Sequence, residues 1–81
     1  MKDLLYNIVA PIVTSVDDIK IDEKVSPSGE RTLYLSVAQS DMGKVIGKRG
    51  KVAKALRSLL KAYAIKNEIR VNLEIVEALE A

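Results

Sequence analysis

The sequence predicts a small α+β domain in which three helices pack on one face of a three-stranded sheet. Apolar residues recur at helical spacing in two long segments and alternate with polar residues in three others, and residues typical of turns separate these segments. With 81 residues the chain has room for one hydrophobic core, so we expect a single domain over residues 1–81. Its central strand–helix–helix–strand unit should span about 31–76, after an N-terminal helix and strand within 3–25.

The N-terminal part of the chain predicts a helix, a strand and a turn. Apolar side chains share one helical face between residues 4 and 13, and Asp3 can cap the start of this helix. Pro11 lacks a backbone N–H group and should bend or shorten the last turn. Alternation then predicts a strand with one buried face, formed by Ile19, Ile21 and Val25. The turn-forming run 26–29 follows, so the next strand should pair antiparallel with the first.

The rest of the chain predicts that second strand, two helices and a last strand. The inward positions of the second strand are Leu33, Leu35 and Val37. Asp41 suits the cap of a very short helix, Met42 to Ile46, which must end at Gly47. A longer helix opens after Gly50 and stops near Asn67, and its expected apolar side consists of Val52, Ala55, Leu56, Leu59, Leu60 and Tyr63. The last strand faces inward with Ile69, Val71, Leu73 and Ile75.

The composition argues against catalysis. The chain has no cysteine and no histidine, which removes thiolate ligands, the commonest general base and the commonest transition-metal ligand. The acidic cluster near the first strand lacks the glycine and the regular oxygen spacing of a calcium loop; its members are Asp17, Asp18, Asp22 and Glu23. We therefore expect no enzyme activity, small-molecule substrate, metal or cofactor. The N-terminus lacks the features of a signal peptide, and no apolar run is long enough to span a membrane, so we expect a cytoplasmic protein.

The basic residues are concentrated in one part of the chain. No Asp or Glu occurs between Asp41 and Glu68, yet this stretch holds eight of the thirteen Lys and Arg residues. A charge run is usually only a solvated face. Eight like charges without a compensating carboxylate are a stronger asymmetry, and they favour a polyanionic partner for one side of the protein.

Gly47-Lys48-Arg49-Gly50 lies within this basic stretch, between the two helices. Gly47 can end the first helix in a left-handed conformation, and Gly50 lacks a Cβ atom, which lets a sugar–phosphate backbone approach the main chain. Unpaired amides at the start of the next helix and the charges of Lys48 and Arg49 suit phosphate groups. A nucleotide-binding P-loop is excluded, because the glycines are one residue too close and no Ser or Thr follows to hold magnesium.

The run Val45-Ile46-Gly47-Lys48-Arg49-Gly50-Lys51-Val52 resembles the signature of the KH family, whose Gly-x-x-Gly loop clamps about four nucleotides of single-stranded RNA or DNA. The order of elements resembles the type II, prokaryotic form of this fold, so the resemblance implies a type II KH-like α+β domain (α-β-β-α-α-β). It implies RNA-binding positions at Gly47, Lys48, Arg49 and Gly50. It also implies an aliphatic groove lined by Val45, Ile46 and Val52. The neighbouring basic residues Lys44, Lys51 and Lys54 complete the set that we expect to bind RNA.

Within the KH family, the run from Asp41 to Lys48 and the proline late in the N-terminal helix resemble the bacterial KhpA family. This resemblance implies cytoplasmic RNA-binding proteins that act as RNA chaperones, self-associate and pair with a larger KH protein, KhpB. It also implies a link to cell-wall homeostasis and cell-length control. We therefore expect single-stranded RNA as the ligand, and a homodimer or a heterodimer with a KhpB-like protein. The alternative is a protein interaction module, in which the KH fold pairs with itself or another protein and RNA binding is secondary.

Overall fold

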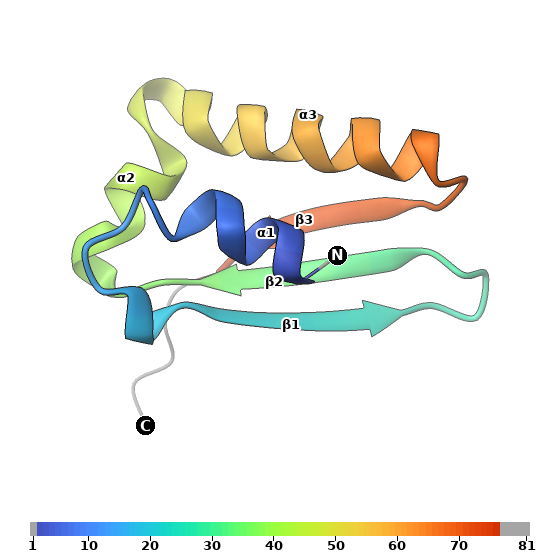
Figure 1. Cartoon of the computed structure of the whole chain (residues 1–81), viewed down its shortest axis with the longest axis horizontal. Helices are drawn as coiled ribbons and strands as arrows, with labels where there is room; N and C mark the ends of the chain where they lie inside the picture. The colour runs from blue at the N-terminus through green and yellow to red at the C-terminus, as the bar shows by residue number, and fades with distance from the viewer. Residues whose placement is uncertain (1, 77–81) are drawn as a thin grey trace.

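The structure is a computed structural model that describes residues 2–76. Its helices are α1 (Lys2–Val9), α2 (Met42–Ile46) and α3 (Lys51–Lys66), and its strands are β1 (Lys20–Val25), β2 (Arg31–Ser36) and β3 (Val71–Ile75). Short 3₁₀ turns span Val16–Asp18, Gln39–Asp41 and Lys48–Gly50. The helices cover one face of the sheet (Figure 1), so the predicted α+β class is confirmed. In this part of the chain no helix combines the length and the hydropathy that crossing a bilayer requires.

The sheet has the strand order β1-β2-β3, with one antiparallel and one parallel pair. The predicted turn joins β1 to β2; the Ser26 amide donates to the Glu30 carbonyl at 2.8 Å, and Gly29 has a φ of 88°. β2 and β3 run parallel because the chain between them crosses over the sheet through α2 and α3. This crossover carries residues 47–50 to one end of the molecule, where α2 meets α3 (Figure 1).

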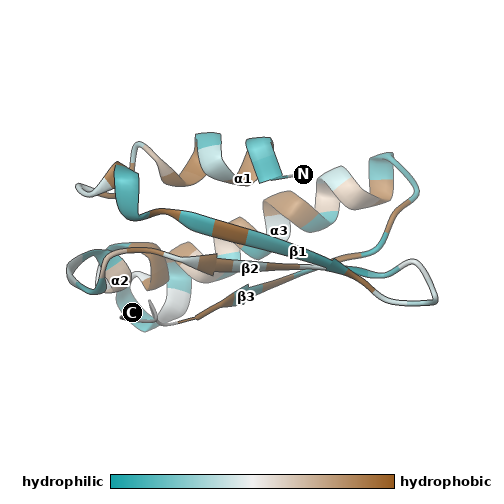
Figure 2. Cartoon of the chain, turned by 90° about the horizontal axis from the view of Figure 1, so that it is seen from below, coloured by the Kyte–Doolittle hydropathy of each residue, from teal (hydrophilic) through white to brown (hydrophobic). Residues whose placement is uncertain are grey.

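The core is built from leucine and valine side chains of the helices and the sheet. The fully buried ones are Leu5, Val9, Leu33, Leu35, Val37, Val45, Leu56 and Leu60. The predicted inward positions of the second strand are therefore confirmed. β1 is mostly hydrophilic with a hydrophobic band within it (Figure 2). Exposed and half-buried side chains alternate over its first four residues, because successive side chains of a strand point to opposite faces. The face away from the helices is polar, and on it the Lys24 ammonium lies 5.5 Å from the centre of the Tyr34 ring.

The N-terminal region confirms the predicted effect of the proline and differs from the prediction in two details, at Asp3 and Val25. α1 ends at Val9, short of residue 13, since Pro11 cannot supply a helical hydrogen bond; Val13 is nevertheless buried. The expected shortening by the proline is thus confirmed. Asp3 lies inside the first turn of α1 and does not cap it. Val25, predicted to face inward, is 60% exposed, because β1 continues past the N-terminal end of α1, the helix that covers it (Figure 1).

The long helix α3 turns a different face to the core from the predicted one. Its buried residues are Ala53, Leu56, Leu60 and Ala64. The predicted inward positions of Leu56 and Leu60 are confirmed. Ala55, Leu59 and Tyr63 were also predicted to face inward, but Leu59 and Tyr63 are 53% and 41% exposed, and Ala55 is exposed too. The helix carries two overlapping apolar stripes, and small side chains at 53 and 64 favour the one that packs closely against β3. The other stripe, consisting of Ala55, Leu59 and Tyr63, remains on the surface and is called the exposed stripe below.

Candidate nucleic-acid interface

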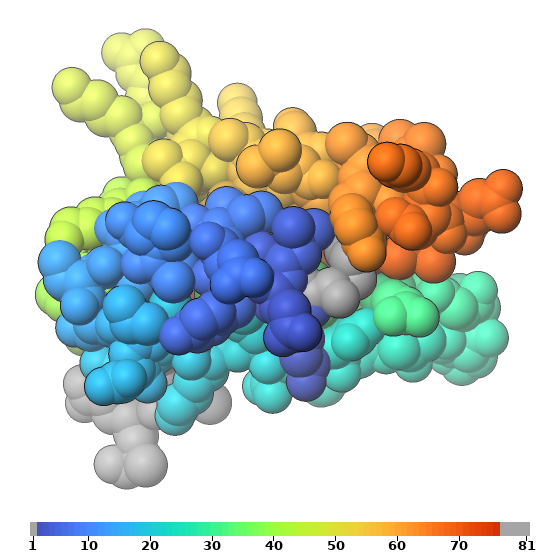
Figure 3. All heavy atoms as spheres, in the orientation of Figure 1, coloured from blue at the N-terminus to red at the C-terminus, as the bar shows by residue number. Residues whose placement is uncertain are grey.

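The loop Gly47–Gly50 joins α2 to α3 in a tight turn. The Gly47 amide donates to the Gly43 carbonyl at 2.8 Å and ends α2, and Lys48–Gly50 forms one 3₁₀ turn. The backbone φ is positive at Gly47 (75°), Arg49 (56°) and Gly50 (74°). Arg49 therefore adopts the left-handed region, which side chains other than glycine rarely occupy. This backbone holds Lys48 and Arg49 at an exposed tip, and side chains of this region stand out from the body of the molecule (Figure 3).

The two glycines of the loop are required for different reasons. A Cβ atom at Gly47 would collide with the Val52 side chain and would lie 2.8 Å from the Val52 backbone nitrogen. The positive φ of Gly47 was predicted, but its ψ of 174° places it outside the left-handed helical region, in backbone space that is almost restricted to glycine. At Gly50, by contrast, a Cβ atom would meet no atom within 4 Å. The space over Gly50 is therefore open to a ligand, whereas Gly47 is needed for packing within the protein.

The backbone amides at the start of α3 are less available than predicted. The Gly50 amide donates to the Gly47 carbonyl at 3.2 Å, and the Lys51 amide donates to the Lys48 carbonyl. The 3₁₀ turn supplies these acceptors, which the free start of a helix lacks. The attraction for phosphate therefore falls mainly to Lys48 and Arg49, with the exposed Lys51 and Lys54 of the first turn of α3 nearby.

The predicted aliphatic groove is divided between the surface and the core. Ile46 is 38% exposed and Val52 is half-buried beside Gly47, so both can contact a base next to the loop. Val45 is completely buried in the core beneath them. Consecutive side chains of a helix point about 100° apart, which lets Val45 enter the core while Ile46 reaches the surface. Val45 therefore supports the groove from below and does not line it.

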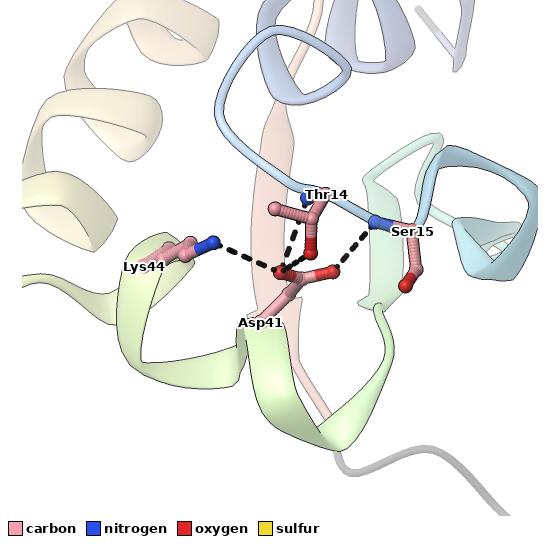
Figure 4. Close-up of polar contacts among 4 residues, drawn as sticks. All are labelled: Thr14, Ser15, Asp41 and Lys44. Carbon is pink, nitrogen blue, oxygen red and sulfur yellow. Dashed lines mark hydrogen bonds and ion pairs between the residues drawn. The ribbon is translucent and has the colours of Figure 1, made fainter.

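Asp41 is fully buried and is the centre of a polar cluster next to this site (Figure 4). Its carboxylate accepts hydrogen bonds from the Ser15 amide at 3.0 Å, the Thr14 amide at 3.1 Å and the Thr14 hydroxyl at 2.8 Å. The Lys44 ammonium lies 3.5 Å from the same carboxylate. The Ser15 amide, followed by the Thr14 hydroxyl, the Thr14 amide and the Lys44 charge, lowers the pKa of Asp41 from 3.8 to about 2, although burial opposes this shift.

This cluster replaces the helix cap that was predicted for Asp41. The residue does precede α2, but its side chain makes no capping hydrogen bond to that helix. Instead it reaches to Thr14 and Ser15, which follow the turn after α1. The physical reason is that the Thr14 and Ser15 amides and the Thr14 hydroxyl converge on the carboxylate and occupy both of its oxygens. The N-terminal segment is thereby fixed to the start of α2, one short helix before the loop.

Two basic side chains near the loop are already engaged within the protein. Lys44, predicted to contact RNA, is paired with Asp41, which offsets part of its charge. Arg57 donates from Nε to the Leu73 carbonyl at 3.2 Å and so joins α3 to β3. The sequence gives no signal for this contact, because an arginine on a basic helix is most often solvated. Among the described residues close to the loop, Lys48, Arg49, Lys51 and Lys54 are exposed and lie in neither of these contacts, so they can meet a phosphate.

The order α-β-β-α-α-β, the mixed sheet and the Gly-x-x-Gly loop between α2 and α3 define a type II KH domain. The sequence model of the family described as "KhpA/KhpB, KH domain" matches residues 2–75, and the chain belongs to this family.

Curated relatives named RNA-binding protein KhpA match almost the whole chain. The Listeria monocytogenes protein is 42% identical over 77 residues, which cover 95% of this chain and 100% of the relative. The Clostridium acetobutylicum protein is 45% identical over 78 residues, covering 94% of this chain and 100% of the relative. The Borreliella burgdorferi protein is 41% identical over 75 residues, covering 93% and 90% of the two chains.

Proposed function

We propose that this protein is a non-catalytic binder of single-stranded RNA that grips about four nucleotides at Gly47–Gly50. Phosphates would lie against Lys48 and Arg49, and bases against Ile46 and Val52. The main support for this proposal is the open space over Gly50, which lies beside the exposed cations Lys48 and Arg49. The name of the relatives, RNA-binding protein KhpA, supports the same class of ligand.

The same site supports a chaperone-like role. Contacts between cations and phosphates position a strand but do not read its sequence. Bases would rest on aliphatic side chains, since the chain has no Phe or Trp, and affinity from one domain should therefore be modest. Weak sites gain avidity when two domains hold one strand, which favours action with a KhpB-like partner. The family's description names KhpB beside KhpA as proteins with this KH domain. From the family resemblance we also propose a cytoplasmic location and a link to cell-wall homeostasis and cell length.

Titration of a labelled single-stranded octauridylate with this protein tests RNA binding. We expect the affinity to fall about 20-fold as KCl rises from about 50 to about 200 mM, because about three phosphates would be neutralised. A duplex RNA of the same length should bind more weakly, since its bases are not free to lie in the groove. Absence of binding, or an affinity that does not respond to salt, would contradict the proposal.

A separate observation favours self-association as a second function. The exposed stripe of Ala55, Leu59 and Tyr63 has an i, i+4 spacing that places its members on one side of α3. Tyr6 of α1, the helix packed beside α3, is also 40% exposed. Large apolar side chains gathered at the surface in this way are typical of protein interfaces. We propose that a homodimer, or a heterodimer with a KhpB-like protein, forms through this stripe, while Arg57 of the same helix faces β3.

Leu59→Asp is expected to weaken self-association at least about 10-fold, because it places a charge in the centre of an apolar interface. Sedimentation equilibrium of the wild type and the variant over a range of concentrations measures this change. Ser58→Asp adds the same charge at the neighbouring exposed position of α3, outside the stripe, and serves as the control. A wild type that stays monomeric, or a variant that associates as the wild type does, would rule out the stripe as the interface.

A further inference from the structure

A pocket of about 250 Å³ lies where the last turns of α3 meet the start of β3, at the opposite end of α3 from the loop. Its floor is apolar and includes Ile65, Ile69 and Val71. Ile65 is 70% exposed, so this apolar surface is accessible. Two exposed cations, Lys61 and Arg70, stand at its rim. The pocket thus combines an open aliphatic surface with two positive charges.

Within residues 2–76, neither Lys61 nor Arg70 forms an ion pair with a carboxylate. The ion pairs found over residues 2–76 are Arg31–Glu23 and Lys44–Asp41, and neither involves these two cations. One carboxylate, that of Glu30, also lines the pocket, but it accepts a hydrogen bond from the side-chain amide of Asn72. An anionic ligand would therefore meet a net positive charge here, because the two cations outnumber the single carboxylate of Glu30.

The pocket continues the seam between α3 and β3 that begins near the loop. Lys54, Arg57 and Lys61 follow one another on α3 at positions i, i+3 and i+7, which share one side of a helix. That side faces β3, since Arg57 bonds the Leu73 carbonyl and Lys61 lines the pocket. Ten residues of helix separate the start of α3 from Lys61, a distance of about 15 Å. A stacked strand rises about 3.4 Å per nucleotide, so about four nucleotides cover this distance.

We propose that this pocket is a second nucleotide subsite for the RNA strand that the loop grips. A base lies on Ile65, Ile69 and Val71, and its phosphate lies between Lys61 and Arg70. The inference rests on the proposed RNA binding and extends that site from about four nucleotides to about eight. Two observations favour a nucleotide as the occupant of the pocket. Lys61 and Arg70 at its rim are positively charged, like Lys54 and Arg57 along the seam that leads to it. The volume of the pocket also suits one base and its sugar better than a larger ligand.

Affinities for single-stranded oligouridylates of four, six, eight and ten nucleotides test the subsite. For the wild type we expect a gain of about tenfold between four and eight nucleotides, beyond the statistical gain from extra binding registers, and little more at ten. Ile65→Gln alters the apolar floor without changing the charge, and Lys61→Ala with Arg70→Ala removes the rim cations. Both variants should bind the tetranucleotide as the wild type does and lose most of the gain with length.

A matched control removes two charges outside the pocket, through Lys20→Ala with Lys66→Ala, both at exposed positions. It should keep the gain with length. The subsite is overturned if wild-type affinity does not rise with length, or if the control loses the gain as fully as the pocket variants do. It is also overturned if the pocket variants keep the gain but alter sedimentation, which would assign the surface to a protein partner. Failure of the proposed function looks different, because the wild type would then bind no oligonucleotide of any length, and both proposals would fall.

Discussion

Replacing Lys48 and Arg49 together by aspartate is expected to weaken binding of single-stranded RNA about 100-fold or more at low salt. Two exposed cations at the loop tip become two anions beside the open space over Gly50, so attraction for phosphate is replaced by repulsion. The dependence on salt should become shallower as well, by about 1.4 in the slope of log affinity against log salt concentration, because two phosphates are no longer neutralised. Fluorescence anisotropy titrations at several KCl concentrations measure both effects.

This loop variant keeps both glycines, because a side chain at Gly47 would collide with Val52 and confuse a binding defect with a folding defect. Aspartate also tolerates the positive φ of position 49 better than most residues. Lys20→Asp with Lys24→Asp makes the same change of net charge at exposed positions of β1, and should weaken binding less than about threefold. If both pairs of substitutions weaken binding equally, RNA responds to the overall charge of the protein and the loop is not the site.

Asp41→Ala is expected to lower the melting temperature by about 10 °C or more at pH 7, the largest effect on stability that we expect from one substitution near the site. The substitution removes the acceptor for the Thr14 and Ser15 amides and the Thr14 hydroxyl, and leaves Lys44 without its partner. Thr14→Ala removes only the hydroxyl contact, so its effect should be smaller. Thermal unfolding followed by circular dichroism measures both. Asp22→Ala, at an exposed carboxylate of β1, is the matched control and should leave the melting temperature nearly unchanged.

The contribution of Asp41 should also depend on pH. Its pKa in the folded protein is about 2, below the ordinary value of 3.8, so the ionised form is favoured by folding. A group with a lowered pKa stabilises the fold fully above its unfolded pKa and loses that effect as the pH falls through its folded pKa. The difference in melting temperature between wild type and Asp41→Ala should therefore be constant from about pH 7 to about pH 5 and shrink between about pH 4 and pH 2. A difference that is as large at pH 2 as at pH 7 would contradict this account.

Most of the fold follows from patterns that act over a few residues. The short helix Met42–Ile46 and the turn at 26–29 were predicted at the positions where the structure has them, because glycine and proline leave the chain few alternatives there. The loop at 47–50 was predicted for the same reason. The parallel pairing of β3 with β2 was not predicted, because a parallel pair depends on a crossover connection that no local residue determines.

What the sequence could not predict depends on contacts between distant segments. Both stripes of α3 are apolar, and only the close approach to β3 makes Ala53 and Ala64 buried and Leu59 exposed. An aspartate before a helix is usually a cap, so the contacts of Asp41 with Thr14 and Ser15 required the folded chain to be seen. The pocket beside Ile65 and Arg70 likewise joins a helix end to a strand start, and no sequence motif describes it.

The contacts of Asp41 also define the smallest piece of this protein that can be transplanted into another chain. A graft limited to the strand–helix–helix–strand unit at about 31–76 would retain Asp41 and Lys44 but would leave Thr14 and Ser15 behind. Such a graft would carry an acidic side chain whose intended donors are missing, immediately before the helix that leads into the loop. A chimaera meant to keep the loop geometry should therefore include the N-terminal helix and the residues after it, so that the donor fragment begins no later than α1.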